Sequence, residues 1–173
     1  MKFGVTAVLA AYVCGLAGPA LAAEATAMFN NGMGAPLGRA TLVDGPTGVL
    51  VRLEIGGLKP GWHAVHFHAK GDCDDPSFNS AGAHINHPTA AKPHGLLNPG
   101  GPDFGDLPNV WAGSDGRVHA QFFSALVSID GQGGRPALKD ADGSALVVHE
   151  NADDYTAQPI GGAGPRVACG AVR

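Results

Sequence analysis

The histidines are the residues of this sequence whose spacing points most clearly to a chemical role. His66 and His68 are separated by one residue inside an apolar segment, and His149 ends another apolar run. Successive side chains of an extended strand point to opposite faces, so His66 and His68 would present both imidazoles on one face. Ring nitrogens that converge in this way are typical ligands of transition metals. The pattern therefore favours a metal site to which strand histidines contribute.

Further ligand types gather in the segment from Ala69 to Pro108, which has little alternation and many Gly, Pro, Asn and Asp residues. Its candidate ligands are His84, His87, His94, Asp103 and Asp106. A structureless segment of this length is uncommon inside a compact domain and is usually functional or disordered. An H-x-H pair alone is a weak signal, since two surface histidines would give the same pattern. Together with this segment it predicts a metal-binding loop, kept ordered by the metal and by a disulfide.

The rest of the chain supplies strands to carry these residues. From Val49 to Ile55 the odd-numbered positions are apolar and the other face is mostly polar, which is the pattern of a half-buried strand. Further strands are predicted at residues 62–68, 118–123 and 145–149, and weaker ones at 24–30, 38–43 and 167–172. The 27 Gly and 13 Pro residues are spread between these runs as turns. Many short strands between turns predict an all-β fold, an antiparallel sandwich or barrel with long loops.

Residues 1–22 have the composition of a secretory signal peptide. Lys2 is the only charge, residues 5–16 are apolar, and Ala20-Leu21-Ala22 matches an A-x-A cleavage site. The apolar run is short for a membrane span and is broken by Gly15, Gly18 and Pro19. We therefore expect export, to the periplasm or out of the cell, and a single domain over residues 23–173.

Outside this leader the chain is mildly acidic, with ten basic and fifteen acidic residues for a formal charge of −5. Since it has no basic run, it offers little to a phosphate backbone, and we expect neither nucleic acid nor a membrane as partner. The cysteines of this part are Cys73 and Cys169. In an exported protein such a pair favours a disulfide over two free thiols. A loop of this length would be worth about 4–5 kcal/mol in the chain-entropy model.

Several motifs resemble those of the copper/zinc superoxide dismutase family, in its exported bacterial form. They are Gly61 to His68, Ser80 to Asn86, His94-Gly95, Gly105 to Val110, Leu146 to Glu150, Asp153-Asp154 and Gly164 to Gly170. The resemblance implies an antiparallel Greek-key β-sandwich or barrel of immunoglobulin-like architecture. It also implies dismutation of superoxide, a small-molecule substrate, to oxygen and hydrogen peroxide, which would protect the cell envelope. Members of the family associate through different faces, and a homodimer is one expectation.

The resemblance assigns roles to individual residues. The copper ligands would be His66, His68, His84 and His149. Four imidazoles in a roughly tetragonal arrangement suit Cu(II). His84 would also bridge to zinc, and Asp153 would hydrogen-bond one histidine on each side. His84 and Arg166 are the expected catalytic residues: the copper–His84 bond would break on reduction, with proton uptake by the ring, and Arg166 would attract the superoxide anion.

The zinc site departs from the family pattern. The family has His three residues before the ligand equivalent to Asp106, whereas this chain has Asp103. Because carboxylates are ordinary zinc ligands, we expect zinc at His84, His94, Asp103 and Asp106, with one more negative charge and greater acid sensitivity. Two alternatives stay open: His87 substitutes, or the zinc site is weak or empty. A copper carrier or store is the rival function, and Asp103 is the feature that favours it.

Overall fold

The computed structural model describes residues 22–173, so the expected leader, residues 1–22, lies outside the described residues apart from Ala22. The described chain forms nine strands and two short 3-10 helices. The strands are β1 (Glu24–Asn30), β2 (Pro36–Gly45), β3 (Gly48–Ile55), β4 (Gly61–His63), β5 (Val65–His68), β6 (Val110–Ala112), β7 (Val118–Ser124), β8 (Ala145–His149) and β9 (Arg166–Val172); the helices are η1 (Asn79–Ala81) and η2 (Gln132–Gly134). No helix in this part of the chain is long and apolar enough to cross a membrane.

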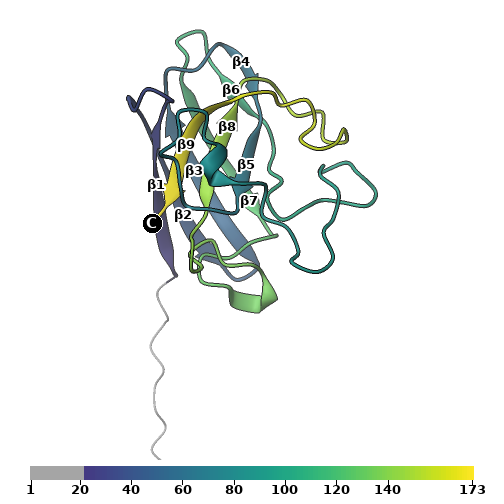
Figure 1. The fold of residues 1–173 in the computed structure, drawn as a ribbon. Coiled ribbons are helices and arrows are strands. Elements are labelled where there is room, and N and C mark those ends of the chain that lie inside the picture. The colour runs from purple at the N-terminus through teal and green to yellow at the C-terminus, as the bar shows by residue number, and fades with distance from the viewer. Residues whose placement is uncertain (1–21) are drawn as a thin grey trace, which may run out of the picture.

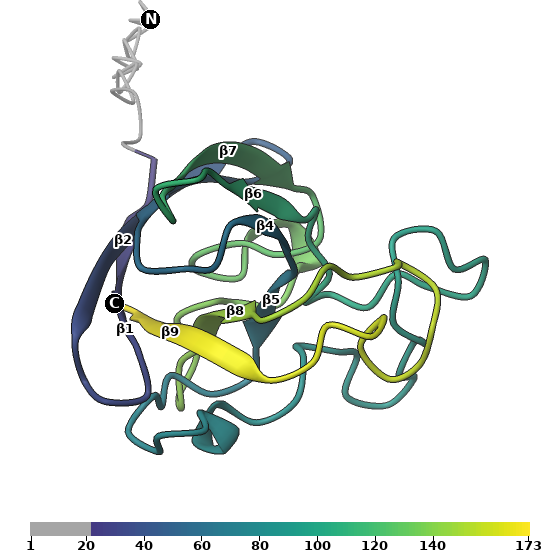
Figure 2. The same ribbon diagram turned by 90° about the horizontal axis from the view of Figure 1, so that it is seen from above.

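Seven strands form one antiparallel sheet in the order β5-β8-β9-β1-β2-β3-β7, and β4 pairs with β6 separately. The large sheet curls around a common core (Figure 1), and β4 and β6 lie between its two ends when the barrel is viewed from above (Figure 2). Strand β9 returns to lie between β8 and β1, so strands distant in sequence are neighbours, as in Greek-key folds. The predicted all-β, antiparallel fold class is confirmed.

The burial of β3 shows why this sequence forms a sheet. Val49, Val51, Leu53 and Ile55 are buried, whereas Arg52 and Glu54 between them are exposed. Strand β1 has the same alternation. The inward side chains of the long strands meet in one hydrophobic core. This packing holds the sheet in a fixed shape, which gives fixed positions to side chains at its edge.

The strand predicted at residues 62–68 is two strands in the structure. Up to His63 the chain pairs with β6, a strand that the sequence did not predict, and from Val65 onward it pairs with β8. At Ala64, between them, the backbone N–H donates to the Asn151 carbonyl at 2.8 Å and the carbonyl accepts from His149 N–H at 2.9 Å. The chain stays extended while it changes partner, so the alternation pattern alone could not reveal the break.

Strands β5 and β8 are buried on both faces, unlike β3. One face packs on the core. Two long loops, residues 69–109 and 150–165, lead away from these strands and project on the same side of the barrel (Figures 1 and 2). The prediction of a long irregular segment between β5 and the next strand is confirmed.

The first loop is tied down at several points. Cys73 forms the predicted disulfide with Cys169 of β9, with 5.7 Å between the Cα atoms. Isolated backbone bridges also join the loop to β5, one of them between His68 and His84. An irregular segment fixed in this way can hold side chains as precisely as a strand does.

Candidate metal centre

Two neighbouring strands and one loop bring four histidines together. His66 and His68 lie on β5, and His149 ends β8, its antiparallel partner. The bridge between His68 and His84 lays the loop against β5. All four imidazoles are buried, and one ring nitrogen from each lies within 4.8 Å of the others. The structure therefore joins the four residues that the resemblance assigned to copper.

One ring nitrogen of each histidine is buried without a hydrogen-bond partner. These atoms are Nδ1 of His66 and Nε2 of His68, His84 and His149. Buried polar atoms are rarely left unpaired, since each costs about 1–3 kcal/mol. Four of them in one cluster indicate a group that binds all of them at once. Four imidazole donors suit Cu(II), so the residues present fit copper.

The opposite ring nitrogens determine the tautomers. Three of them donate to oxygens that can only accept: His66 Nε2 to Asp153 Oδ2 at 3.0 Å, His68 Nδ1 to the Gly82 carbonyl at 2.9 Å, and His149 Nδ1 to the Gly164 carbonyl at 3.0 Å. The hydrogen of each neutral ring therefore lies on that nitrogen. The unpartnered nitrogen keeps the lone pair, which is what a metal ion requires.

Burial keeps these imidazoles neutral. It lowers the pKa of His66 to about 3, against the opposing hydrogen bond to Asp153, and the pKa of His149 to about 4. Burial, followed by neighbouring positive charge, also holds the pKa of His68 well below its ordinary value. At neutral pH these three histidines can bind a cation without first losing a proton.

A second cluster lies on the other side of His84. His84 Nδ1 is 3.0 Å from Asp103 Oδ2, and His94 Nδ1 is 2.5 Å from Asp106 Oδ1. All four residues are buried, with one ligand atom of each within 4.8 Å of the rest. His94 Nδ1 and Asp106 Oδ1 are close but not aligned for a hydrogen bond, and both lack a partner. Two imidazole nitrogens and two carboxylate oxygens form a donor set that fits zinc.

The backbone fixes the remaining carboxylate oxygens of this cluster. Asp106 Oδ2 accepts the N–H groups of Gly95 at 2.7 Å and of Asp103 at 2.9 Å. Asp103 Oδ1 accepts the Gly105 N–H at 2.9 Å. A Cβ added to Gly105 would lie 2.4 Å from the Phe67 carbonyl oxygen, so only glycine lets the loop approach β5 here. Each carboxylate is thereby oriented, with its other oxygen turned to the cluster.

Asp153 links the two clusters. Its Oδ2 accepts from His66 Nε2 at 3.0 Å and its Oδ1 from His94 Nε2 at 3.1 Å, as the resemblance implied. Burial raises the pKa of Asp153, but these donors outweigh burial and hold that pKa below its usual range. For His94, burial lowers the pKa, and the Asp106 and Asp153 carboxylates outweigh it and raise the pKa to about 10. Without metal, His94 is therefore protonated at neutral pH.

Sequence reasoning missed the residues that hold Asp153 itself. Asn109 exchanges two hydrogen bonds with the Asp153 backbone, each 2.9 Å long. The Tyr155 N–H donates to Asp153 Oδ1 at 2.6 Å, and a Cβ added to Gly161 would lie 1.7 Å from the same oxygen. Asn109 lies inside the motif Gly105 to Val110, which resembles the family, so the sequence did contain a signal for this residue. Tyr155 donates through its backbone N–H, a group that every residue except proline has, so the residue type does not indicate this hydrogen bond.

Arg166 begins β9 and extends to the first loop. Its guanidinium donates to the Phe78 carbonyl and, at 2.7 Å, to the Gly82 carbonyl. The Gly82 oxygen also accepts from His68 Nδ1, so one carbonyl group separates Arg166 from the four-histidine cluster. After burial, the charge of Arg166 is one of the causes that lower the pKa of His68 and of His149. A fixed cation therefore stands beside this cluster.

The alternative zinc ligand, His87, lies outside both clusters. Its side chain is exposed, and its Nδ1 accepts the backbone N–H of Ala90 at 3.0 Å. Among the described residues the ligand groups on the zinc side are formed by other side chains. The structure therefore favours Asp103 over His87 at this position.

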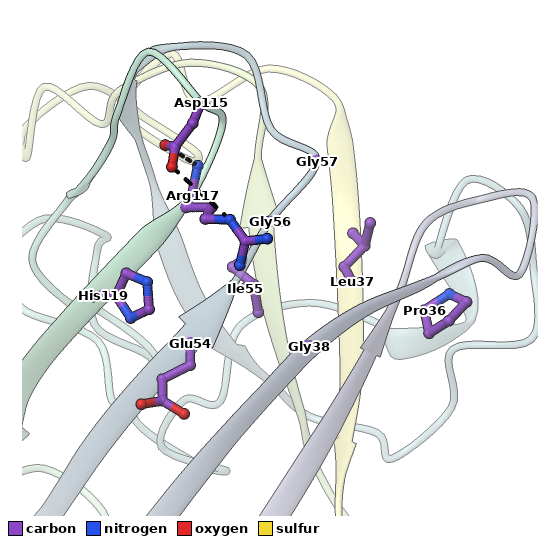
Figure 3. Close-up of a pocket in the computed structure, with 10 residues that line it drawn as sticks. All are labelled: Pro36, Leu37, Gly38, Glu54, Ile55, Gly56, Gly57, Asp115, Arg117 and His119. Carbon is purple, nitrogen blue, oxygen red and sulfur yellow. Dashed lines mark hydrogen bonds and ion pairs between the residues drawn. The ribbon is translucent and has the colours of Figure 1, made fainter.

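A cavity of about 510 Å³ lies elsewhere on the barrel, at the ends of β2, β3 and β7. Figure 3 shows Glu54, Arg117 and His119 around it, with Arg117 beside Asp115. None of the residues that line it belongs to either cluster. A diatomic or ionic ligand needs no large cavity, so the clusters and not this cavity define the site.

Comparison with known proteins identifies the family. The sequence profile of the family described as copper/zinc superoxide dismutase (SODC) matches residues 37–172. A superoxide dismutase [Cu-Zn] from Caulobacter vibrioides is 57% identical over 150 residues, 87% of this chain and 86% of that protein. The chain belongs to the copper/zinc superoxide dismutase family.

Solved structures of similar proteins agree. A Cu/Zn superoxide dismutase from Brucella abortus superposes with a TM-score of 0.68 at 25% identity, covering 87% of this chain and 100% of that one. A double mutant of a SOD-like protein from Bacillus subtilis gives a TM-score of 0.79 at 36% identity, covering 84% and 95%. The chain is thus a superoxide dismutase, an oxidoreductase with copper and zinc as cofactors, and the two clusters have the donor sets those ions need.

Proposed function

We propose that this chain dismutes superoxide at a copper ion held by His66, His68, His84 and His149. The set of four buried, unpartnered ring nitrogens is the observation that supports this assignment. Copper bound there would supply one-electron redox chemistry, alternately accepting an electron from superoxide and returning one. The remaining work falls to the protein: to hold the donors, to admit the small anion and to deliver protons.

Arg166 binds the anion in this proposal. Its guanidinium is fixed by the Phe78 and Gly82 carbonyls and lies one carbonyl away from His68. Guanidinium is a permanent cation with several donors, so it can hold a diatomic anion next to the four-histidine cluster. The protein as a whole is negatively charged, so the attraction must be local and must weaken as salt is added.

His84 handles the proton. Among the four histidines it is the one whose Nε2 faces the copper side while its Nδ1 faces the acidic cluster. Peroxide formation consumes protons, and Nε2 of this ring is placed to take up a proton and to release it to the product. Because Nδ1 is directed to Asp103, the ring keeps its orientation while Nε2 exchanges its proton.

Asp103 takes the zinc-ligand position at which the family normally has histidine. The short distance from its Oδ2 to His84 Nδ1, its burial and its anchored second oxygen support this assignment. A site of His84, His94, Asp103 and Asp106 has two carboxylates, so bound zinc would be electrically neutralised within the protein. Two carboxylates also make the site more sensitive to acid.

We place this activity in the cell envelope, where the enzyme would protect against superoxide. The support comes from the secretory composition of residues 1–22 and from the Cys73–Cys169 disulfide, which oxidising compartments maintain. Cell fractionation tests it. The full chain should appear without residues 1–22 in the periplasm or medium, and a chain lacking them should remain in the cytoplasm.

The copper assignment is tested on one purified, metal-loaded sample. We expect about one copper per chain with fast superoxide consumption, and His149→Ala should lose both copper and activity because a direct metal ligand is removed. His119→Ala is the matched control, since His119 is an exposed histidine on β7 away from both clusters. Bound copper with no turnover in the native chain would favour a carrier instead.

A further inference from the structure

The two cysteines of the disulfide differ in accessibility. Cys169 is completely buried and packs in a small hydrophobic cluster with Phe78 and Val147. Cys73 is partly exposed and lines a surface groove of about 340 Å³. A molecule approaching from solvent through this groove therefore meets the Cys73 half of the bond.

The groove lies between the start of the first loop and the outer faces of β1 and β9. Thr26, Met28 and Asn30 of β1 line one side, and they occupy the outward positions of that strand. The Arg173 guanidinium lies at the groove and donates to the Gly71 carbonyl at 2.9 Å, which fixes the loop just before Cys73. The groove is thus a built part of the surface, bounded by strands and a tethered loop.

The surroundings of the groove are acidic. Asp72 and Asp74 are exposed and line it. An adjoining cavity of about 290 Å³ shares Gly71 and Arg173 with it. The charged side chains that line the two cavities are Asp72, Asp74, Asp140 and Asp142 against Lys139 and Arg173. Four acids against two bases give these lining side chains a net charge of −2.

We propose that Cys73 is the site of thiol–disulfide exchange in this protein, and that the acidic groove selects thiols that carry positive charge beside the sulfur. The external thiolate would attack Cys73 Sγ and form a new S–S bond to it, while the Cys73–Cys169 bond breaks and Cys169 leaves as a thiolate. A second external thiol can then attack the external sulfur of this mixed disulfide, which frees Cys73 and releases the oxidised thiol pair.

The same path runs backwards during oxidation. The Cys73 thiolate would attack the disulfide of an oxidised partner, and Cys169 would then displace the partner as a dithiol. The partner that fits is a thiol–disulfide oxidoreductase with basic residues around its active-site cysteine, because opposite charges raise the rate of encounter at low salt. An anionic thiol would be repelled by the same acids.

Three small thiols test both parts of the proposal on the metal-loaded enzyme. Cysteamine is cationic, 2-mercaptoethanol neutral and 2-mercaptoethanesulfonate anionic. The reaction runs without oxygen and is quenched by alkylation, and peptide mapping locates the adduct. We expect the external thiol on Cys73 and the alkyl group on Cys169. Per thiolate, cysteamine should react about fivefold faster than the sulfonate at low ionic strength, and the ratio should fall below about twofold near 0.3 M salt.

Charge variants separate the groove from the rest of the surface. Asp72→Asn with Asp74→Asn should remove most of the preference for cysteamine, and Asn keeps the acceptor that Asp72 Oδ1 offers to the Asp74 N–H. Asp115→Asn with Asp130→Asn makes the same charge change at exposed residues that do not line the groove, and should leave the preference in place. An adduct on Cys169, or equal rates for the three thiols at low salt, would overturn the proposal. Superoxide turnover is not the readout, so the outcome is independent of the copper assignment.

Discussion

The copper side and the zinc side of this centre share His84 but are built in opposite ways. On the copper side, strands of a packed barrel carry His66, His68 and His149, whose rings are neutral because burial lowers their pKa. On the zinc side, a loop supplies two carboxylates and a histidine whose pKa is raised to about 10. The copper side is a rigid set of neutral nitrogen donors. The second is a cluster of charges that holds a proton where the metal would bind.

This difference shows how one protein can keep two ions distinct. Neutral imidazoles in a rigid frame favour a borderline ion such as copper, whereas added carboxylates favour zinc or a harder ion. Besides the shared His84, Asp153 bonds to both sides, through His66 and His94. The two sides can therefore be separated by mutation everywhere except at His84 and Asp153.

Removing one ligand from each side should break the centre in two different ways. His68→Ala should abolish copper binding and superoxide turnover while zinc binding persists, because His68 is not part of the zinc-side cluster. His94→Ala should do the reverse for zinc and leave copper bound. Metal analysis and activity on the same samples provide the measurement. If His94→Ala loses copper as completely as His68→Ala, the two sides are not separate sites.

Asp153→Asn should weaken both sides at once, and this is the next largest effect. The amide can accept a hydrogen bond at one atom only, so one of His66 and His94 loses its acceptor. Changes to such outer partners cost about 10- to 100-fold in metal affinity. Competition with a chelator measures it for each metal. Asp154→Asn is the matched control, since the Asp154 carboxylate bonds only to its own loop, at Thr156 and Ala157.

The sequence predicted the copper side better than the zinc side, for a physical reason. Alternation along β5 places His66 and His68 on one face of a strand, a rule that follows from backbone geometry. The strand break at Ala64 and the pairing of β4 with β6 depend on which other strand each segment pairs with. The local residue pattern does not specify that partner.

On the zinc side, resemblance rather than periodicity supplied the candidates. The loop has no repeating pattern, and its order comes from backbone donors such as the Gly95 and Gly105 N–H groups, which every residue except proline possesses. The sequence therefore left Asp103 and His87 as rivals for zinc. Only the tertiary structure shows Asp103 against His84 and His87 turned to solvent.

Arg166→Ala should reduce turnover about tenfold or more and flatten its salt dependence, because a local cation that attracts the substrate is lost. Copper content should stay the same, since Arg166 contacts carbonyl groups and not the ring nitrogens. Arg117→Ala is the control, an exposed arginine near Asp115 on the far cavity. A loss of copper from Arg166→Ala would show that the residue supports the fold of the site instead of binding the anion.

The smallest expected effect is the number of protons released when a metal binds. It tests most directly the difference in charge between the copper side and the zinc side. In the metal-free protein the pKa of His94 is about 10, so at pH 7 zinc must displace a proton from it. Zinc affinity should then rise about tenfold per pH unit up to that pKa, and calorimetry in buffers of different ionisation enthalpy should show about one proton released from this residue.

The pKa values of His66 and His149, about 3 and about 4, lie below this range, so neither ring releases a proton to copper above pH 5. If the native chain releases as many protons to copper as to zinc, the two sides do not differ in charge as the structure indicates.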